Sequence, residues 1–249
     1  MRELSLFSGA GGGLLASRLL GFNTIGYVEY EEYCQKVIEQ RITDGLLDAA
    51  PIFGDIKRFI SEGYADSYKG MVDVLTGGVP CQPWSVCGKQ KKEKDERNLW
   101  PETIECMRII RPNFGYFENV ANILNAKYYG RIIIELSKIG YISRWETLGG
   151  KEVNNVCDGE RVWLLAFKTD CRMLEGMDIQ KYIKPYSEES RRRQYSRAVR
   201  SMLSQDDYSR IKRNLDVVAA GMDRLKAIGN GQIPAVAAAA WRILTQGVL

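Results

Sequence analysis

The segment from Leu4 to Phe22 reads LSLFSGAGGGLLASRLLGF, and it joins a β-type run, four glycines and an apolar pattern of helical spacing. The first run predicts a strand and the last predicts an amphipathic helix. The glycines between them predict a tight turn whose backbone a ligand can approach closely. Taken alone, the glycines are explained slightly better by the turn itself than by a ligand.

Two further features favour a cofactor that contains adenosine. Glu29 ends the next predicted strand, 18 residues after Gly11, where a carboxylate can hold ribose hydroxyls. The segment GDI at residues 54–56 follows a third short β-type run. Together with the glycine turn, both features predict a binding site for a cofactor that contains adenosine.

Beyond this segment, β-type runs alternate with helical patterns, which predicts an α/β sheet with crossover helices. The predicted strands are 3–7, 24–30, 72–78, 113–120, 141–148 and 161–167. The predicted helices are 14–21, 31–41, 99–111, 128–140 and an alanine-rich helix after a turn within 227–244. We therefore expect a catalytic domain at 1–170, a small basic region at 171–216 and a segment at 217–249 that completes the catalytic domain.

The composition excludes several kinds of site. The 249 residues include no histidine, and the six cysteines lack CxxC spacing, which argues against a metal site and against disulfides. Catalysis must then use cysteine, carboxylates, arginine or a cofactor. No apolar stretch approaches a membrane span and the N-terminus lacks the form of a signal peptide, so we expect a cytoplasmic protein.

Two candidate reactive side chains follow predicted strands. Cys81 lies between Pro80 and Gln82, directly after the run VDVLTGG. Most buried cysteines are inert, but a thiol in a proline-flanked loop at a strand end is placed where α/β enzymes hold nucleophiles. Glu118 ends the strand within YFENV and can exchange a proton in the same cleft. A surface carboxylate that caps the next helix is the alternative for Glu118.

The positive charge is concentrated in one segment. Residues 184–213 carry nine basic and four acidic side chains, while the whole chain has a net charge of +4. A weaker cluster, GKQKKEKDERN, follows the cysteine loop at residues 88–98. Both suit contacts to nucleic-acid phosphates, and a solvated helix face is the equal alternative.

The ordered set of motifs resembles the carbon-5 cytosine-specific DNA methyltransferase family over nearly the whole chain. LFSGAGG resembles the family's S-adenosylmethionine turn and PCQPWS its catalytic loop. ENV resembles its glutamate motif, and IGNGQIP resembles the C-terminal element that completes the cofactor pocket. The resemblance implies a Rossmann-like sheet with helices on both faces and a small basic recognition insertion.

The resemblance also implies a DNA (cytosine-5-)-methyltransferase with a covalent mechanism. Cys81 would attack carbon 6 of a cytosine flipped out of the duplex, and Glu118 would hydrogen-bond its ring nitrogen and amine. Carbon 5 would take the methyl group of S-adenosylmethionine, leaving S-adenosylhomocysteine, and no metal is required. Arg161 matches an arginine that contacts the flipped base and the cysteine loop.

Two further sets of site residues are expected, of which the cofactor contacts carry over from the family. The implied cofactor contacts, in which Tyr30 stacks on the adenine and Asp55 accepts from its amino group, are Phe7, Ser8, Gly9, Gly11, Glu29, Tyr30, Asp55, Ile56, Pro80, Leu99 and Asn230. The expected DNA contacts, in the cysteine loop and the two basic clusters, are Gln82, Ser85, Lys89, Lys91, Arg191, Arg192, Arg193 and Arg197.

The sequence departs from the family at two places. The family's Gln-x-Arg-x-Arg motif is replaced by VCDGERVW, so Cys157 and Gly159 stand in the first two positions and Arg161 alone remains. The recognition region, which is usually a substantial subdomain, is reduced to residues 171–216. A region of this length predicts a short recognition sequence, weak specificity or a compact version from a virus or mobile element.

Two alternatives remain open. A related enzyme that methylates cytosine in transfer RNA would use the same Cys81 and Glu118, although the loop VPCQPWS favours DNA. A catalytically silent nucleic-acid-binding protein on the same fold is the second alternative. For the DNA enzyme we expect duplex DNA as partner, a monomer, a prokaryotic or phage source, and in some systems a cognate restriction endonuclease.

Overall fold

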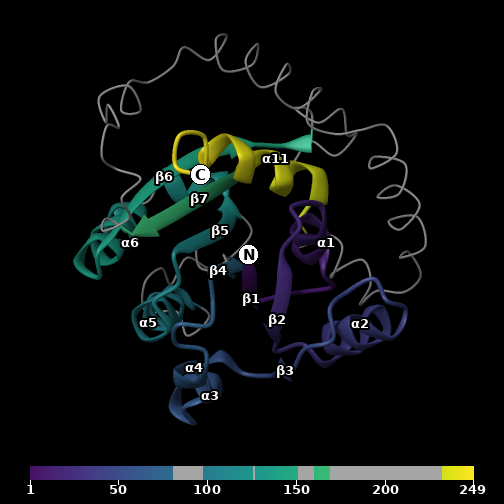
Figure 1. Cartoon of the computed structure of the whole chain (residues 1–249). Helices are drawn as coiled ribbons and strands as arrows, with labels where there is room; N and C mark the ends of the chain where they lie inside the picture. The colour runs from purple at the N-terminus through teal and green to yellow at the C-terminus, as the bar shows by residue number, and fades with distance from the viewer. Residues whose placement is uncertain (81–97, 126, 151–159, 169–231) are drawn as a thin grey trace.

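The computed structural model of the chain describes residues 1–80, 98–125, 127–150, 160–168 and 232–249. Within these residues lies a sheet of seven strands in the order β3-β2-β1-β4-β5-β7-β6 (Figure 1). The pairs from β3 to β5 are parallel, and β7 is antiparallel to both of its neighbours. The strands are β1 (Arg2–Leu6), β2 (Asn23–Val28), β3 (Ile52–Phe53), β4 (Val74–Gly78), β5 (Phe114–Val120), β6 (Tyr141–Leu148) and β7 (Arg161–Lys168).

Helices connect the strands and cover both faces of this sheet. They are α1 (Gly12–Leu19), α2 (Glu32–Thr43), α3 (Ile56–Ser61), α4 (Tyr64–Ser67), α5 (Trp100–Ile110), the 3-10 helix η3 (Ala121–Asn125), α6 (Lys127–Lys138) and α11 (Pro234–Leu244). Helices α1 and α11 contact each other, as do α5 and both α3 and α6. The predicted α/β sheet with helices on both faces is confirmed.

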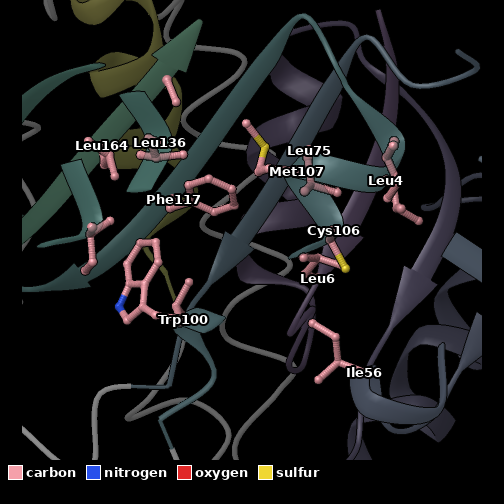
Figure 2. Close-up of a cluster of buried hydrophobic side chains, with 14 of the residues drawn as sticks. Leu4, Leu6, Ile56, Leu75, Trp100, Cys106, Met107, Phe117, Leu136 and Leu164 are labelled. Carbon is pink, nitrogen blue, oxygen red and sulfur yellow. The ribbon is translucent and has the colours of Figure 1, made fainter. Parts of the chain in front are cut away.

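The alternation of side chains along β5 shows how the two layers are separated. Phe117 points into a core shared with α3, α5 and α6, where it meets Trp100 with ring centroids 5.7 Å apart (Figure 2). Its neighbour Tyr116 lies in the other core, against Trp241 of α11 at 5.3 Å. Successive side chains of a strand point to opposite faces, so one strand supports both layers.

Helix α11 is buried around most of its circumference. Pro234 begins the helix, where its fixed φ is tolerated, and Ala235 to Trp241 are all buried. The small alanine side chains let the helix approach α1 and the sheet closely. Trp241 fills the remaining space and contacts Phe22 and Phe114 at 5.1 and 5.6 Å.

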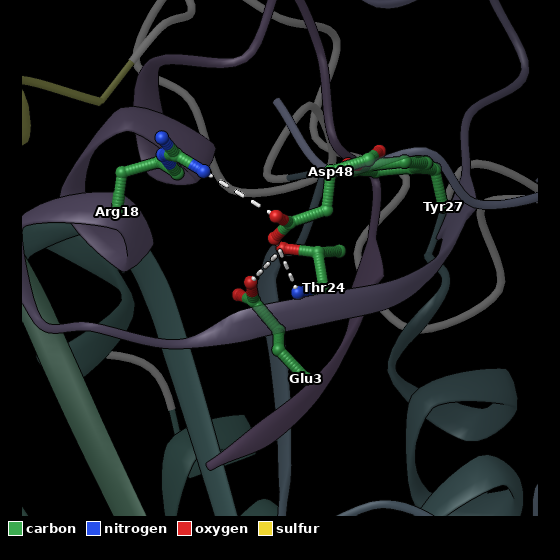
Figure 3. A network of polar contacts seen from close by, with 5 residues as sticks. All are labelled: Glu3, Arg18, Thr24, Tyr27 and Asp48. Atoms are coloured by element: carbon green, nitrogen blue, oxygen red, sulfur yellow. Dashed lines mark hydrogen bonds and ion pairs between the residues drawn. The ribbon is translucent and has the colours of Figure 1, made fainter. Parts of the chain in front are cut away.

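A buried carboxylate joins the first elements of the chain. Glu3 of β1 is fully buried and accepts hydrogen bonds from Ser17 at 2.7 Å and from Thr24 and Thr76 at 2.6 Å each. Figure 3 shows Glu3 and Thr24 beside Asp48, which accepts from the Thr24 main-chain N–H at 2.8 Å. Burial raises the pKa of Glu3 despite the three hydroxyl donors.

The predicted elements agree with the described ones to within a few residues at each end. The strand predicted at 3–7 is β1 at Arg2–Leu6, and the one predicted at 141–148 is β6. The predicted basic region at 171–216, and residues 217–231 of the segment after it, lie outside the described residues.

Candidate functional site

The glycine turn leads from β1 into α1 through three residues with left-handed backbone. Phe7, Gly9 and Gly11 have φ of 51°, 55° and 84°. The Gly11 N–H donates to the Ser8 carbonyl at 3.0 Å, and the Ser8 hydroxyl donates to the Ser5 carbonyl at 3.1 Å. Ser8 therefore uses its buried hydroxyl to fix the turn, while Gly9 faces open space, with no atom within 4 Å of where a Cβ would stand.

Glu29 connects the end of β2 to this turn. Its carboxylate accepts from the Gly9 N–H at 2.6 Å and from the Glu31 N–H at 2.8 Å. Burial raises the pKa of Glu29, and these hydrogen bonds oppose the rise. A carboxylate has about four lone-pair directions, so this one can accept from hydroxyl groups in addition.

Arg41 of α2 contacts the main chain of the glycine turn, a role that the sequence patterns did not reveal. Its Nη1 donates to the Ala10 carbonyl, and it lies 2.7 Å from where a Cβ of Gly11 would stand. Burial lowers the pKa of the guanidinium. A side chain at position 11 would displace this guanidinium, and the left-handed backbone there, with φ of 84°, also favours glycine.

The other predicted cofactor residues near β2 and β3 differ in which of their groups a ligand could contact. Tyr30 is 74% exposed, so its ring is free to stack on a ligand. Asp55 caps α3 by accepting from the Lys57 N–H at 2.9 Å. The Ile56 side chain is buried in the core, so only its main-chain groups could contact a cofactor.

The end of β4 is fixed against β5. Gly78 pairs with Glu118, and the Val79 N–H donates to the Glu118 carbonyl at 3.2 Å. Asn119 donates from its amide to the Val79 carbonyl at 3.1 Å. Strands β1, β4 and β5 are parallel neighbours, so the glycine turn after β1, Pro80 after β4 and Glu118 near the end of β5 lie at the carboxyl ends of adjacent strands.

Glu118 and Arg161 form an ion pair at this edge. Arg161 begins β7, and its Nε lies 2.9 Å from Glu118 Oε1. The Glu118 side chain is only 10% exposed, and burial raises its pKa to about 7, against the opposing effect of Arg161. Burial thus brings the pKa of this carboxyl group closer to neutral pH than that of an ordinary glutamate, as suits a group that exchanges protons.

Gln232, which the sequence analysis did not single out, contacts the same glutamate. Its side-chain amide hydrogen-bonds Glu118 and lowers the pKa of the carboxyl group. The residue lies in the IGNGQIP segment, which the family resemblance predicts to complete the cofactor pocket. No periodicity or charge pattern could have identified Gln232, because its role depends on a contact between distant parts of the chain.

Two of the remaining predicted site residues, Pro80 and Leu99, lie within the described residues, and the others lie outside them. Leu99 precedes α5 and packs partly against the core, and Pro80 is half-buried. The predicted site residues outside the described residues are Cys81, Gln82, Ser85, Lys89, Lys91, Arg191, Arg192, Arg193, Arg197 and Asn230.

The described residues offer neither a metal-binding cluster nor a membrane-spanning helix. Within residues 1–80, 98–125, 127–150, 160–168 and 232–249, no group of three or more histidine, cysteine or acidic side chains could hold a metal ion. In the same ranges, no helix has the length and apolar character needed to cross a membrane.

Comparison with known proteins gives one family and a set of relatives. The family model for C-5 cytosine-specific DNA methylase matches residues 1–229. Type II methyltransferase M.NgoMIV from Neisseria gonorrhoeae is 32% identical over 172 residues, 68% of this chain and 52% of that protein. Type II methyltransferase M.FnuDI from Fusobacterium nucleatum is 31% identical over 199 residues, which are 78% of this chain and 53% of that protein.

The fold also matches solved structures. A mutant of DNMT2 from Spodoptera frugiperda superimposes with a TM-score of 0.54 and 19% identity, over 69% of this chain and 51% of that one. The chain spans about half the length of the curated relatives it matches.

Proposed function

Because the chain belongs to the C-5 cytosine-specific DNA methylase family, we propose that it transfers a methyl group from S-adenosylmethionine to carbon 5 of cytosine in DNA. One observation carries the proposal. At the carboxyl edge of the sheet, a buried Glu118 with a pKa of about 7 pairs with Arg161 at 2.9 Å. The chain reaches Cys81 three residues after Gly78, which pairs with Glu118.

The glycine turn fits S-adenosylmethionine as the methyl donor. The open space at Gly9, the buried Glu29 carboxylate and the exposed Tyr30 ring provide a backbone approach, a hydroxyl acceptor and a stacking surface. Bound there, S-adenosylmethionine supplies an electrophilic methyl group. The other residues that would hold it are Phe7, Ser8, Gly11, Asp55, Ile56, Pro80, Leu99 and Asn230.

The chain's own residues perform the steps on the base. The Cys81 thiolate forms a bond to carbon 6, and the electron pair of the carbon 5–carbon 6 double bond makes carbon 5 nucleophilic. Protonated Glu118 donates to the ring nitrogen and stabilises the negative charge that develops there. After methylation, water takes the proton from carbon 5 and the carbon–sulfur bond breaks, which restores the double bond and the thiolate. Arg161 orients the Glu118 carboxylate throughout.

Duplex DNA is the proposed substrate, with the target base flipped into the site. The basic clusters at 88–98 and 184–213 would contact its phosphates. Two relatives are named Type II methyltransferases, which supports a prokaryotic or phage protein that acts on DNA in the cytoplasm. A cognate endonuclease in the same system and a monomeric state belong to the same proposal.

A transfer assay with tritiated S-adenosylmethionine tests the activity on duplex DNA and on RNA separately. A duplex that contains 5-fluorocytosine is included, because fluorine at carbon 5 blocks the final elimination and leaves the base bound to the enzyme. We expect label in DNA and a covalent adduct, both lost in Cys81→Ser while S-adenosylmethionine still binds within a few fold.

The other outcomes of the transfer assay would favour an alternative or refute the mechanism. Label confined to RNA would favour the transfer RNA enzyme. Binding of S-adenosylmethionine with no label in either nucleic acid would refute the proposed activity and favour the silent binding protein. Turnover that survives in Cys81→Ser would refute the covalent mechanism.

A further inference from the structure

Three glycines make room for Gln232 between α1 and β4. A Cβ at Gly12 would stand 2.4 Å from the Gln232 carbonyl oxygen, and one at Gly13 would stand 2.6 Å from its Oε1. A Cβ at Gly78 would stand 3.1 Å from its Nε2. Gly12 therefore leaves room for the main chain of Gln232, and Gly13 and Gly78 leave room for its side-chain amide.

The same space borders the Glu118 carboxylate. A Cβ at Gly78 would stand 3.2 Å from Glu118 Oε2, close to Gln232 Nε2 as well. The glutamine amide hydrogen-bonds the Glu118 carboxylate. Arg161 Nε contacts the other oxygen, Oε1, at 2.9 Å. Two side chains from separate parts of the chain, Arg161 of β7 and Gln232 just before α11, thus contact one buried carboxyl group.

We propose that Gln232 is a positioning residue for Glu118, whose carboxyl group it orients toward the bound cytosine together with Arg161. The inference rests on the proposed methyl transfer. Without the amide, the carboxyl group would keep the Arg161 contact and lose the restraint that Gln232 adds. A residue just before α11 would then control the chemistry of a residue on β5.

A packing role alone would make a different prediction. Gln232 also joins α11 to α1, so its loss could weaken the fold without affecting the glutamate. A hydrogen bond to the ionised form of an acid lowers its pKa, whereas a packing contact distant from the charge does not. The titration of Glu118 therefore separates the two roles.

Gln232→Met removes the amide and keeps an unbranched side chain of similar length. Gly13→Ala leaves the amide in the chain but places a Cβ 2.6 Å from its present oxygen, so the flexible side chain must move away from Glu118. Gly130→Ala is the matched control, because a Cβ at Gly130 of α6 meets nothing within 4 Å.

The measurement is a carbon-13 NMR titration of glutamate carboxyl groups, in which Glu118 is assigned by the signal missing from Glu118→Gln. The pH profile of methyl transfer is recorded for the same variants. We expect the pKa of Glu118 to rise from about 7 by about one pH unit in Gln232→Met, by less in Gly13→Ala and not at all in Gly130→Ala. The pH profile should move in the same direction by a similar amount.

Two results would overturn the inference: a Glu118 titration that both test variants leave unchanged, or a shifted titration without a shifted pH profile. If Gln232→Met does not fold, Gly13→Ala decides between these outcomes. A wild-type protein that methylates neither DNA nor RNA would refute the proposed function instead. The Glu118 titration would still report in that case whether Gln232 holds the carboxyl group.

Discussion

Gly12→Ala tests whether α1 and the segment before α11 are as tightly joined as the structure indicates. A Cβ at Gly12 would stand 2.4 Å from the Gln232 carbonyl oxygen, 3.2 Å from its nitrogen and 3.3 Å from its carbonyl carbon. These are main-chain atoms, so no side-chain rotation relieves the overlap. Since ordinary contacts of this kind begin at 3.4 Å, the two segments must separate by about 1 Å.

The expected cost follows from two opposing effects. Overpacking a close contact costs roughly 1–3 kcal/mol. Replacing glycine by alanine inside a helix returns up to about 1 kcal/mol, and less at Gly12, which is the first residue of α1. We therefore expect Gly12→Ala to lower the free energy of unfolding by roughly 1–2 kcal/mol.

Urea unfolding followed by tryptophan fluorescence measures this change. Gly130→Ala serves as the control, since its Cβ meets no atom within 4 Å and α6 should gain up to about 1 kcal/mol. A Gly12→Ala variant that is as stable as Gly130→Ala would refute the close contact between α1 and the main chain of Gln232.

Three further predictions concern charged groups. Arg161→Leu should raise the pKa of Glu118 above about 7 and move the pH profile of methyl transfer upward; an unmoved profile would contradict the ion pair's role. Because the folded-state pKa of Glu3 is raised, its contribution to stability is fully present below the unfolded value of 4.5 and is lost as pH rises through the folded value. Urea unfolding should therefore show Glu3→Gln gaining stability relative to wild type with rising pH, and a constant difference would count against this. Neutralising the arginines at 191–193 should weaken duplex binding and flatten its salt dependence, whereas unchanged affinity at fixed salt would identify a merely solvated face.

The sequence predicted the sheet because its signals are local. The run from Leu4 to Phe22 contains a strand, a glycine turn and a helix in direct succession, and the structure has β1, the turn and α1 there. Glu118 could likewise be placed at a strand end from YFENV alone. Short-range patterns of this kind do not depend on which distant segment packs on them.

The contacts that complete the candidate site are not local. Gln232 meets Gly12, Gly13 and Glu118 only because α11 returns to α1 across the sheet. Arg41 reaches the glycine turn from the last turn of α2, 31 residues away. Such partners are set by tertiary packing, so neither residue type nor spacing could distinguish them from ordinary surface side chains.

The position of α11 also has a consequence for the order of synthesis. A ribosome completes all seven described strands by Lys168, well before it makes Pro234 to Leu244. Until then Phe22, Phe114 and Tyr116 lack the Trp241 ring that packs on them, and Glu118 lacks the Gln232 amide. The nascent chain therefore holds an uncovered apolar face and an incomplete site, as expected of a folding intermediate that needs protection from aggregation. Premature termination after β7 would yield a sheet that cannot assemble this site.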